Sequence, residues 1–191
     1  MRESVNCTRL RSFLSRCTSL RALELLYGYR AFGRADLSSV FNGLRLPALR
    51  RLVLDNVGAG PDAVRDFIVA HSALETLHIC AAPNFDTSAV PDGALPKLIS
   101  YAPNSSHILL LAAAADGSPP LEEVVLNARQ LDQFRPWQKP LEELQNTVKR
   151  IGLWDPYSRT NATPITEALP GFLVDRATRN PWYYQDISEP Q

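Results

Sequence analysis

Three histidines and three cysteines are the side chains best suited to catalysis or metal binding in this sequence. His78 and Cys80 lie two positions apart, so on a strand both point to the same face and offer two metal ligands. A structural zinc site needs four ligands, and no third or fourth candidate lies nearby in the sequence. The sequence therefore predicts no metal site and no cofactor.

The motifs that activate a nucleophile or hold a phosphate are also absent from the sequence. Ser105 and Ser106 precede His107, but the Gly-x-Ser-x-Gly turn of a hydrolase is missing. Neither a P-loop nor a Gly-x-Gly-x-x-Gly segment is present, since Gly60 is followed directly by Pro61. We therefore predict that the chain is not an enzyme. The alternative is a small catalytic domain on an α/β fold that these patterns do not detect.

Composition and charge narrow the classes of partner. The 191 residues are 45% hydrophobic and 21% charged, as in an ordinary globular protein, and the formal net charge is zero. A general nucleic-acid binder carries a basic excess, so no nucleic-acid partner is predicted. Residues 1–34 differ from the rest, with seven arginines against Glu3 and Glu24. This basic end suits either solvent or an acidic partner.

Cysteine usage and apolar runs indicate the compartment. Three cysteines without a close pair argue against a disulfide framework and fit a reducing environment. The N-terminus has no apolar signal core, and the longest apolar run, residues 108–115, is less than half a membrane span. We attribute three matches to the glycosylation pattern, at Asn6, Asn104 and Asn161, to chance. The prediction is a soluble intracellular protein, cytoplasmic or nuclear, with no membrane partner.

A repeat is the strongest signal in the sequence. Six segments share the pattern apolar-x-x-apolar-x-apolar, and the fourth is degenerate because Pro103 takes its last position. The segments begin at Leu20, Leu49, Leu74, Leu98, Leu121 and Val148. Steps of 23 to 29 residues are typical of leucine-rich repeats (LRRs). The last two apolar residues of each copy point to one side of a short strand, and stacked copies bury them in columns.

We therefore predict an α/β fold, namely a leucine-rich-repeat solenoid of about five or six short parallel strands with helices and loops on the convex side. The positions predicted to be buried are Leu23, Leu25, Leu52, Leu54, Leu77, Ile79, Val124, Leu126, Ile151 and Leu153. Residues 1–155 are expected to form the solenoid. Residues 156–191, which contain five prolines, are expected to form an irregular C-terminal cap or tail.

Between the strands the apolar spacing becomes that of a helix. The first predicted helix has one apolar face made of Leu10, Phe13, Leu14 and Cys17. Residues 36–42 predict a short helix ended by Gly43. Residues 106–115 predict a further helix, whereas residues 81–94 predict an irregular loop.

The clearest helix is predicted over residues 60–71. Asp62 is expected to cap it, and its buried face is expected to consist of Val64, Phe67 and Ile68. His71 lies at its end, where a positive charge suits the helix dipole.

The segments from Leu46 to Val57 and from Asp62 to Ile79 resemble the LRR part of F-box/LRR proteins. They follow the rhythm Leu-Pro-x-Leu-x-x-Leu-x-Leu, a turn, a helix, then x-Leu-Glu-x-Leu. In that family an F-box docks on a ubiquitin-ligase adaptor and the LRR surface recruits the substrate. The resemblance covers roughly residues 10–153 and implies the recognition half alone, because a repeat-like helix begins too early for an F-box. Adaptor binding is therefore not expected. The alternative is a truncated, non-functional fragment of a longer LRR protein.

The resemblance and the strand pattern together predict where a partner binds. Residues between the buried positions of a strand must face the opposite, concave side of the sheet, which helices do not cover in an LRR. The predicted protein-binding residues are Glu24, Arg51, Val53, Asp55, Thr76, His78, Glu123, Val125, Arg150 and Trp154. Arg51, Arg150 and Trp154 lead, because arginine and tryptophan dominate interface hot spots. The alternative is a solvated sheet face, with binding by the loops or the proline-rich tail.

Overall fold

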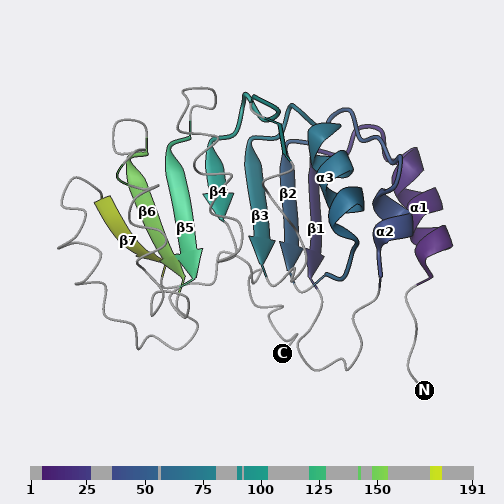
Figure 1. Ribbon diagram of the computed structural model, residues 1–191, viewed down its shortest axis with the longest axis horizontal. Helices are drawn as coiled ribbons and strands as arrows, with labels where there is room; N and C mark the ends of the chain where they lie inside the picture. The colour runs from purple at the N-terminus through teal and green to yellow at the C-terminus, as the bar shows by residue number, and fades with distance from the viewer. Residues whose placement is uncertain are drawn as a thin grey trace, which may run out of the picture.

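The structure is a computed structural model that describes residues 6–26, 36–55, 57–80, 90–91, 93–102, 121–127, 142, 148–154 and 173–177. Its centre is one all-parallel sheet of seven strands arranged in sequence order (Figure 1). The strands are β1 (Ala22–Leu26), β2 (Arg51–Asp55), β3 (Thr76–Cys80), β4 (Ser100–Ala102), β5 (Glu123–Asn127), β6 (Arg150–Trp154) and β7 (Leu173–Ala177). The predicted α/β class with parallel strands is confirmed.

Three helices of the described part each precede one of the first three strands. They are α1 (Cys7–Arg16), α2 (Ser38–Phe41) and α3 (Pro61–Val69). They lie beside one another at the β1 end of the sheet (Figure 1). No helix in the described ranges is long and apolar enough to cross a membrane.

The register of the sheet aligns the apolar positions of successive copies. The second apolar position forms one row across six strands: Leu23, Leu52, Leu77, Tyr101, Val124 and Ile151. All six side chains are buried, and so are Leu54, Ile79 and Leu126 from the third position. Leu25 is only partly buried, and the side chain of Leu153 lies outside the described part. The predicted core columns are therefore confirmed wherever the structure describes them, apart from the partial exposure at Leu25.

One backbone pattern recurs where the strands begin. The carbonyl of Arg21 accepts hydrogen bonds from the N–H groups of both Arg50 and Arg51, at 2.8 and 3.0 Å. Four further carbonyls, each directly before a strand, also accept two hydrogen bonds from the N–H groups at the start of the next strand. They belong to Arg50, Glu75, Ile99 and Glu122. The same backbone contact is therefore made at the start of each strand from β2 to β6.

The helices pack on the face of the sheet that carries the leucine rows. Val64, Phe67 and Ile68 of α3 are buried there as predicted. Phe67 also meets Phe41 of α2 with ring centroids 5.0 Å apart. Asp62 does not cap α3, which is a correction. Pro61 already occupies the first helical position, so Gly60 is the cap residue and Asp62 lies in the first turn.

The first helix differs from the prediction at one position. Leu14 is buried and Leu10 is partly buried, but Phe13 is 65% exposed. The prediction that Phe13 joins the buried face is wrong. Among the described elements the main neighbour of α1 is α2, and the side of the helix that carries Phe13 is left uncovered. Asn6 caps the helix by accepting a hydrogen bond from the N–H of Arg9.

The last strand lies in the segment that was predicted to be irregular. β7 pairs with β6 and places Val174 opposite Ile151 but Arg176 opposite Leu153. The apolar spacing is therefore lost, which explains why the repeat pattern did not detect the strand. β4 is short and ends directly before Pro103, in accord with the degenerate fourth copy. The helix predicted over residues 106–115 and most of the 81–94 loop lie outside the described residues.

Candidate protein-binding face

Alternate strand residues project to the side of the sheet away from the helices, which we call the far face. Nine of the predicted binding residues lie on strands β1 to β6 at far-face positions: Glu24, Arg51, Val53, Asp55, Thr76, His78, Glu123, Val125 and Arg150. Trp154 ends β6 and pairs in register with Asn127 and Ala177, but its side chain lies outside the described part. The structure therefore brings the predicted set together on one surface of the sheet.

The first residues of the strands form a polar row that we call the first row: Arg51, Thr76, Ser100, Glu123 and Arg150. Arg51 Nε lies 2.8 Å from Glu24 Oε1 on the neighbouring strand. The guanidinium of Arg150 lies 3.6 Å from Glu123 Oε1. The second oxygen of this carboxylate, Oε2, accepts a hydrogen bond of 3.0 Å from the Ser100 hydroxyl. Neighbouring strands are thus joined by charged and polar contacts across this row.

His78 continues this chain into the sheet. Its Nε2 lies 3.2 Å from Ser100 Oγ. Because the single hydroxyl hydrogen of Ser100 goes to Glu123, His78 must carry its hydrogen on Nε2 and donate to the hydroxyl. In a serine nucleophile and base pair the serine instead donates to the imidazole. The three side chains therefore form a structural link across β3, β4 and β5.

Burial controls the charge state of His78. The side chain is 4% exposed, and burial, helped by the nearby Arg51, lowers the pKa of His78 to about 3. The imidazole is neutral near pH 7 and acts there as a hydrogen-bond donor. Its burial also leaves almost no surface for direct contact with a partner.

The middle of the far face is buried as well. Val53, Ala102 and Val125 form a small apolar cluster separate from the main core. Gly152 continues this row, and a Cβ atom there would lie 3.2 Å from Val125 Cγ2. The prediction that Val53, His78 and Val125 offer surface to a partner is therefore corrected. Alternation assigns a residue to a face of the sheet but does not determine whether that face is covered.

Asp55 is another buried far-face residue. It is 8% exposed, and its Oδ1 has no hydrogen-bond partner among the residues that the structure describes. Burial raises the pKa of the Asp55 carboxyl above its usual value. The buried carboxylate is thus destabilised in the folded chain near neutral pH.

His71 has a structural role that the sequence did not reveal. The residue is buried, and its Nε2 accepts the N–H of Leu46 at 2.9 Å. Nδ1 therefore carries the hydrogen and donates to the carbonyl of Phe67. Burial is the main reason that the pKa of His71 is lowered, so the expected positive charge at the helix end is wrong.

The position of His71 explains why it is buried. Leu46 and His71 each accept a turn hydrogen bond, from Leu49 and Leu74 respectively, the first apolar residues of successive copies. The two residues therefore occupy equivalent places before β2 and β3, and the imidazole joins the two turns. The sequence contained a signal for this role, because Leu46 and His71 each lie three residues before the first leucine of a repeat segment.

The described residues contain no group of three histidine, cysteine, aspartate or glutamate side chains that could hold a metal ion. No protein-family model matches the chain, and no curated protein matches it in sequence. The function is therefore inferred from the chain's own residues.

Proposed function

We propose that the chain is a leucine-rich-repeat solenoid that binds a protein partner without catalysing a reaction. The recurrence of one stacking pattern in successive coils carries this proposal. The same paired backbone hydrogen bonds occur at the start of β2, β3, β4, β5 and β6. They coincide with the apolar repeat at steps of 23 to 29 residues. The resemblance to the recognition part of F-box/LRR proteins agrees with a partner-recruiting role.

One exposed part of the far face lies where the strands begin, and Leu26 at the end of β1 is exposed as well. The side chain of Arg150 is 56% exposed, and Arg51 and Glu123 are partly exposed. The residues directly before these strands form a neighbouring line that we call the rim: Arg50, Glu75, Ile99, Glu122 and Lys149. The rim side chains are also accessible, including Ile99 at 41%. The first row and the rim together make the surface that we assign to the partner.

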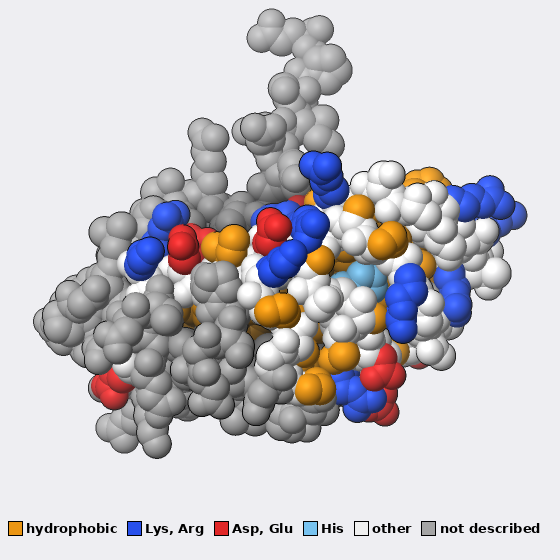
Figure 2. Space-filling model, turned by 90° about the horizontal axis from the view of Figure 1, so that it is seen from above, with side chains coloured by type: hydrophobic (Ala, Val, Ile, Leu, Met, Phe, Trp, Pro, Cys, Tyr) orange, Lys and Arg blue, Asp and Glu red, His pale blue; other side chains and the backbone are white. Residues whose placement is uncertain are grey.

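The order of charges on this surface suits a protein. Along the rim it runs basic, acidic, apolar, acidic, basic, and Figure 2, which looks down on the starts of the strands, shows blue and red side chains around an orange one. A polyanion such as nucleic acid would need one sign of charge. The pairs Arg50–Glu75 and Lys149–Glu122 are 3.9 and 3.8 Å long and exposed, so they contribute little to stability and can exchange for partner groups.

A pull-down with the full chain as bait tests this proposal. Proteins recovered by the unmodified chain, identified by mass spectrometry, are compared with those recovered by the double variant Arg51→Glu with Arg150→Glu. The control is Arg65→Glu, because Arg65 is also paired with carboxylates and similarly exposed but lies on α3. We expect the double variant to lose a protein that the control retains, with affinity at least about tenfold weaker, roughly 1.4 kcal/mol.

Circular dichroism must show that the variants remain folded. The proposal fails if Arg65→Glu loses the same protein to the same extent. It also fails if deletion of residues 178–191, which leaves β7 in the sheet, abolishes binding while the far-face variant does not, because the site would then lie in the C-terminal segment.

A further inference from the structure

Positive charge is concentrated at the beginning of the chain. Residues 1–50 hold nine arginines and three acidic residues, a net charge of +6, so residues 51–191 carry −6 in a chain of zero net charge. Blue side chains appear at the α1 end of the molecule in Figure 2. The charge is therefore strongly polarised along the sequence.

The arginines at the α1 end differ from those elsewhere in their pairing. Arg50, Arg51, Arg65 and Arg150 each have a carboxylate partner. By contrast, no carboxylate of the described residues lies within ion-pair distance of four exposed arginines: Arg9, Arg16, Arg21 and Arg45. The positive charge at this end is thus not neutralised within the described structure.

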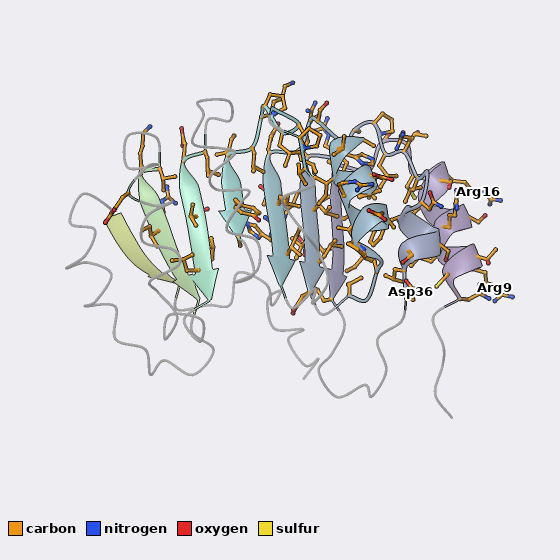
Figure 3. The ribbon with its side chains drawn as sticks, viewed as in Figure 1. Arg9, Arg16 and Asp36 are labelled. Atoms are coloured by element: carbon orange, nitrogen blue, oxygen red, sulfur yellow. The ribbon has the colours of Figure 1, made fainter. Side chains whose placement is uncertain are left out.

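An acidic side chain of the described residues at this end, Asp36, is already engaged. Asp36 lies at the start of α2 and accepts hydrogen bonds from the N–H and the hydroxyl of Ser38. Figure 3 shows Arg9 and Arg16 extending outward from α1, with Asp36 beside the start of α2. Arg11 is the arginine that holds α1 in place, because its guanidinium donates to the carbonyl of Ser39 at 3.0 Å.

An exposed aromatic ring completes the outer surface of α1. Phe13 is four residues after Arg9 and three before Arg16, so the three side chains form one stripe along the helix. The stripe is about 10 Å long at 1.5 Å per residue, which matches three or four residues of an extended peptide. Arginine and aromatic residues are the types most enriched in interface hot spots.

We propose that this stripe, Arg9, Phe13 and Arg16, is a second docking site, which binds a short acidic peptide segment with an apolar residue among its carboxylates. Charge complementarity selects an acidic ligand, and Phe13 selects the apolar residue. The short stripe and the net charge of −6 on the rest of the chain disfavour a long polyanion, which would extend over repelling surface. This site is independent of the far face.

Fluorescence anisotropy with a defined probe tests the proposal. A fluorescein-labelled peptide of glutamates around a central leucine is titrated with the full chain at low salt. We expect Arg16→Glu to weaken binding by about tenfold or more. The matched control is Lys97→Glu, which makes the same charge change at an exposed lysine before β4 and should weaken binding by less than about twofold.

The apolar contact is tested separately. Replacing the probe's leucine with glycine should weaken binding to the unmodified chain by about threefold, and Phe13→Ser should remove that difference. Thermal unfolding followed by circular dichroism must show that the variants are folded.

Four results would overturn the proposal. Absence of measurable binding would show that the stripe does not bind such a peptide. Equal weakening by Lys97→Glu would show that the net charge of the chain alone attracts the peptide. Duplex DNA or anionic lipid vesicles that bind more tightly than the peptide, and lose binding with Arg16→Glu, would assign the stripe to those ligands. Concentration-dependent self-association in sedimentation that Arg16→Glu abolishes would assign it to a second copy of the chain.

Discussion

The two faces of the sheet are built from alternate residues of the same strands, yet they differ in composition. The helix side repeats leucine or a similar residue in each coil, and its six-residue row is buried throughout. The far face changes residue type at each strand and joins neighbours by ion pairs and hydrogen bonds. The comparison indicates that the repeated residues specify the fold, while the variable residues are free to specify a partner.

Adjacent residues on β3 provide the strongest test of this comparison. Leu77 is fully buried in the leucine row, and Thr76, next to it, lies half-buried on the far face. Leu77→Ala leaves a cavity and should lower the free energy of unfolding by roughly 2–5 kcal/mol. Thr76→Ala should lower it by less than about 1 kcal/mol. Urea unfolding of both variants measures the difference, and equal losses would contradict the assignment of the two faces.

A pH titration tests the buried polar residue of the far face. The pKa of folded His78 is about 3, below the unfolded value of about 6.5, so the unfolded chain binds more protons between these values. The contribution of His78 to stability is therefore complete above about pH 6.5 and is lost as the pH falls toward 3. The loss is about 1.4 kcal/mol for each pH unit.

The variant His78→Gln isolates this contribution, because glutamine keeps a donor for Ser100 but does not titrate. Urea unfolding between pH 7 and 4 should show a shallower decline in the variant than in the unmodified chain, by about 1.4 kcal/mol per pH unit. Parallel curves would show that His78 titrates normally in the folded chain, and therefore that the middle of the far face is open to water.

Sequence patterns predicted the burial of residues on the helix side of the sheet but not on the far face. Leu52 and Leu77 follow a strict spacing with one physical meaning, burial in a stack, so their environment was predictable. Val53 and His78 were correctly assigned to the opposite face, but both are buried there, and alternation does not predict whether a face is covered. The candidate site was thus predicted in position and not in accessibility.

The errors in the rest of the fold have local causes. His71 was expected to be charged at a helix end, but burial lowers its pKa and keeps the imidazole neutral near pH 7, while the carbonyl of Phe67 and the N–H of Leu46 fix its orientation. Phe13 was expected to be buried because its spacing fits the apolar face, yet α1 is the first described helix and no described element covers the side that carries Phe13. Both errors arise because helical spacing alone contains no information about neighbouring coils.

Asp55 tests whether every far-face residue favours the fold. Its Oδ1 is buried without a partner in the described part of the chain, and burial raises its pKa, so the carboxylate is less stable in the folded chain than in the unfolded chain near pH 7. Asp55→Asn should therefore stabilise the protein by about 1 kcal/mol at pH 7. A raised folded pKa means that the unmodified chain regains this stability as the pH falls, so the advantage of the variant should vanish in acid. A destabilised variant at pH 7 would show that the carboxylate is satisfied.

The smallest expected effect separates two ion pairs of the far face. Arg51 and Glu24 meet at 2.8 Å with side chains 34% and 16% exposed, whereas Arg150 and Glu123 meet at 3.6 Å with Arg150 largely exposed. Shorter distance and lower exposure both strengthen a charge pair, because less water screens it.

A double-mutant cycle with alanine should give a coupling of about 1 kcal/mol for Glu24 with Arg51, at the upper end for partly exposed pairs. The cycle for Glu123 with Arg150 should give less than about 0.5 kcal/mol, and added salt should reduce it further. A larger coupling at Arg150 would mean that this side chain is committed to the sheet, and it would weaken its assignment as a residue free to meet a partner.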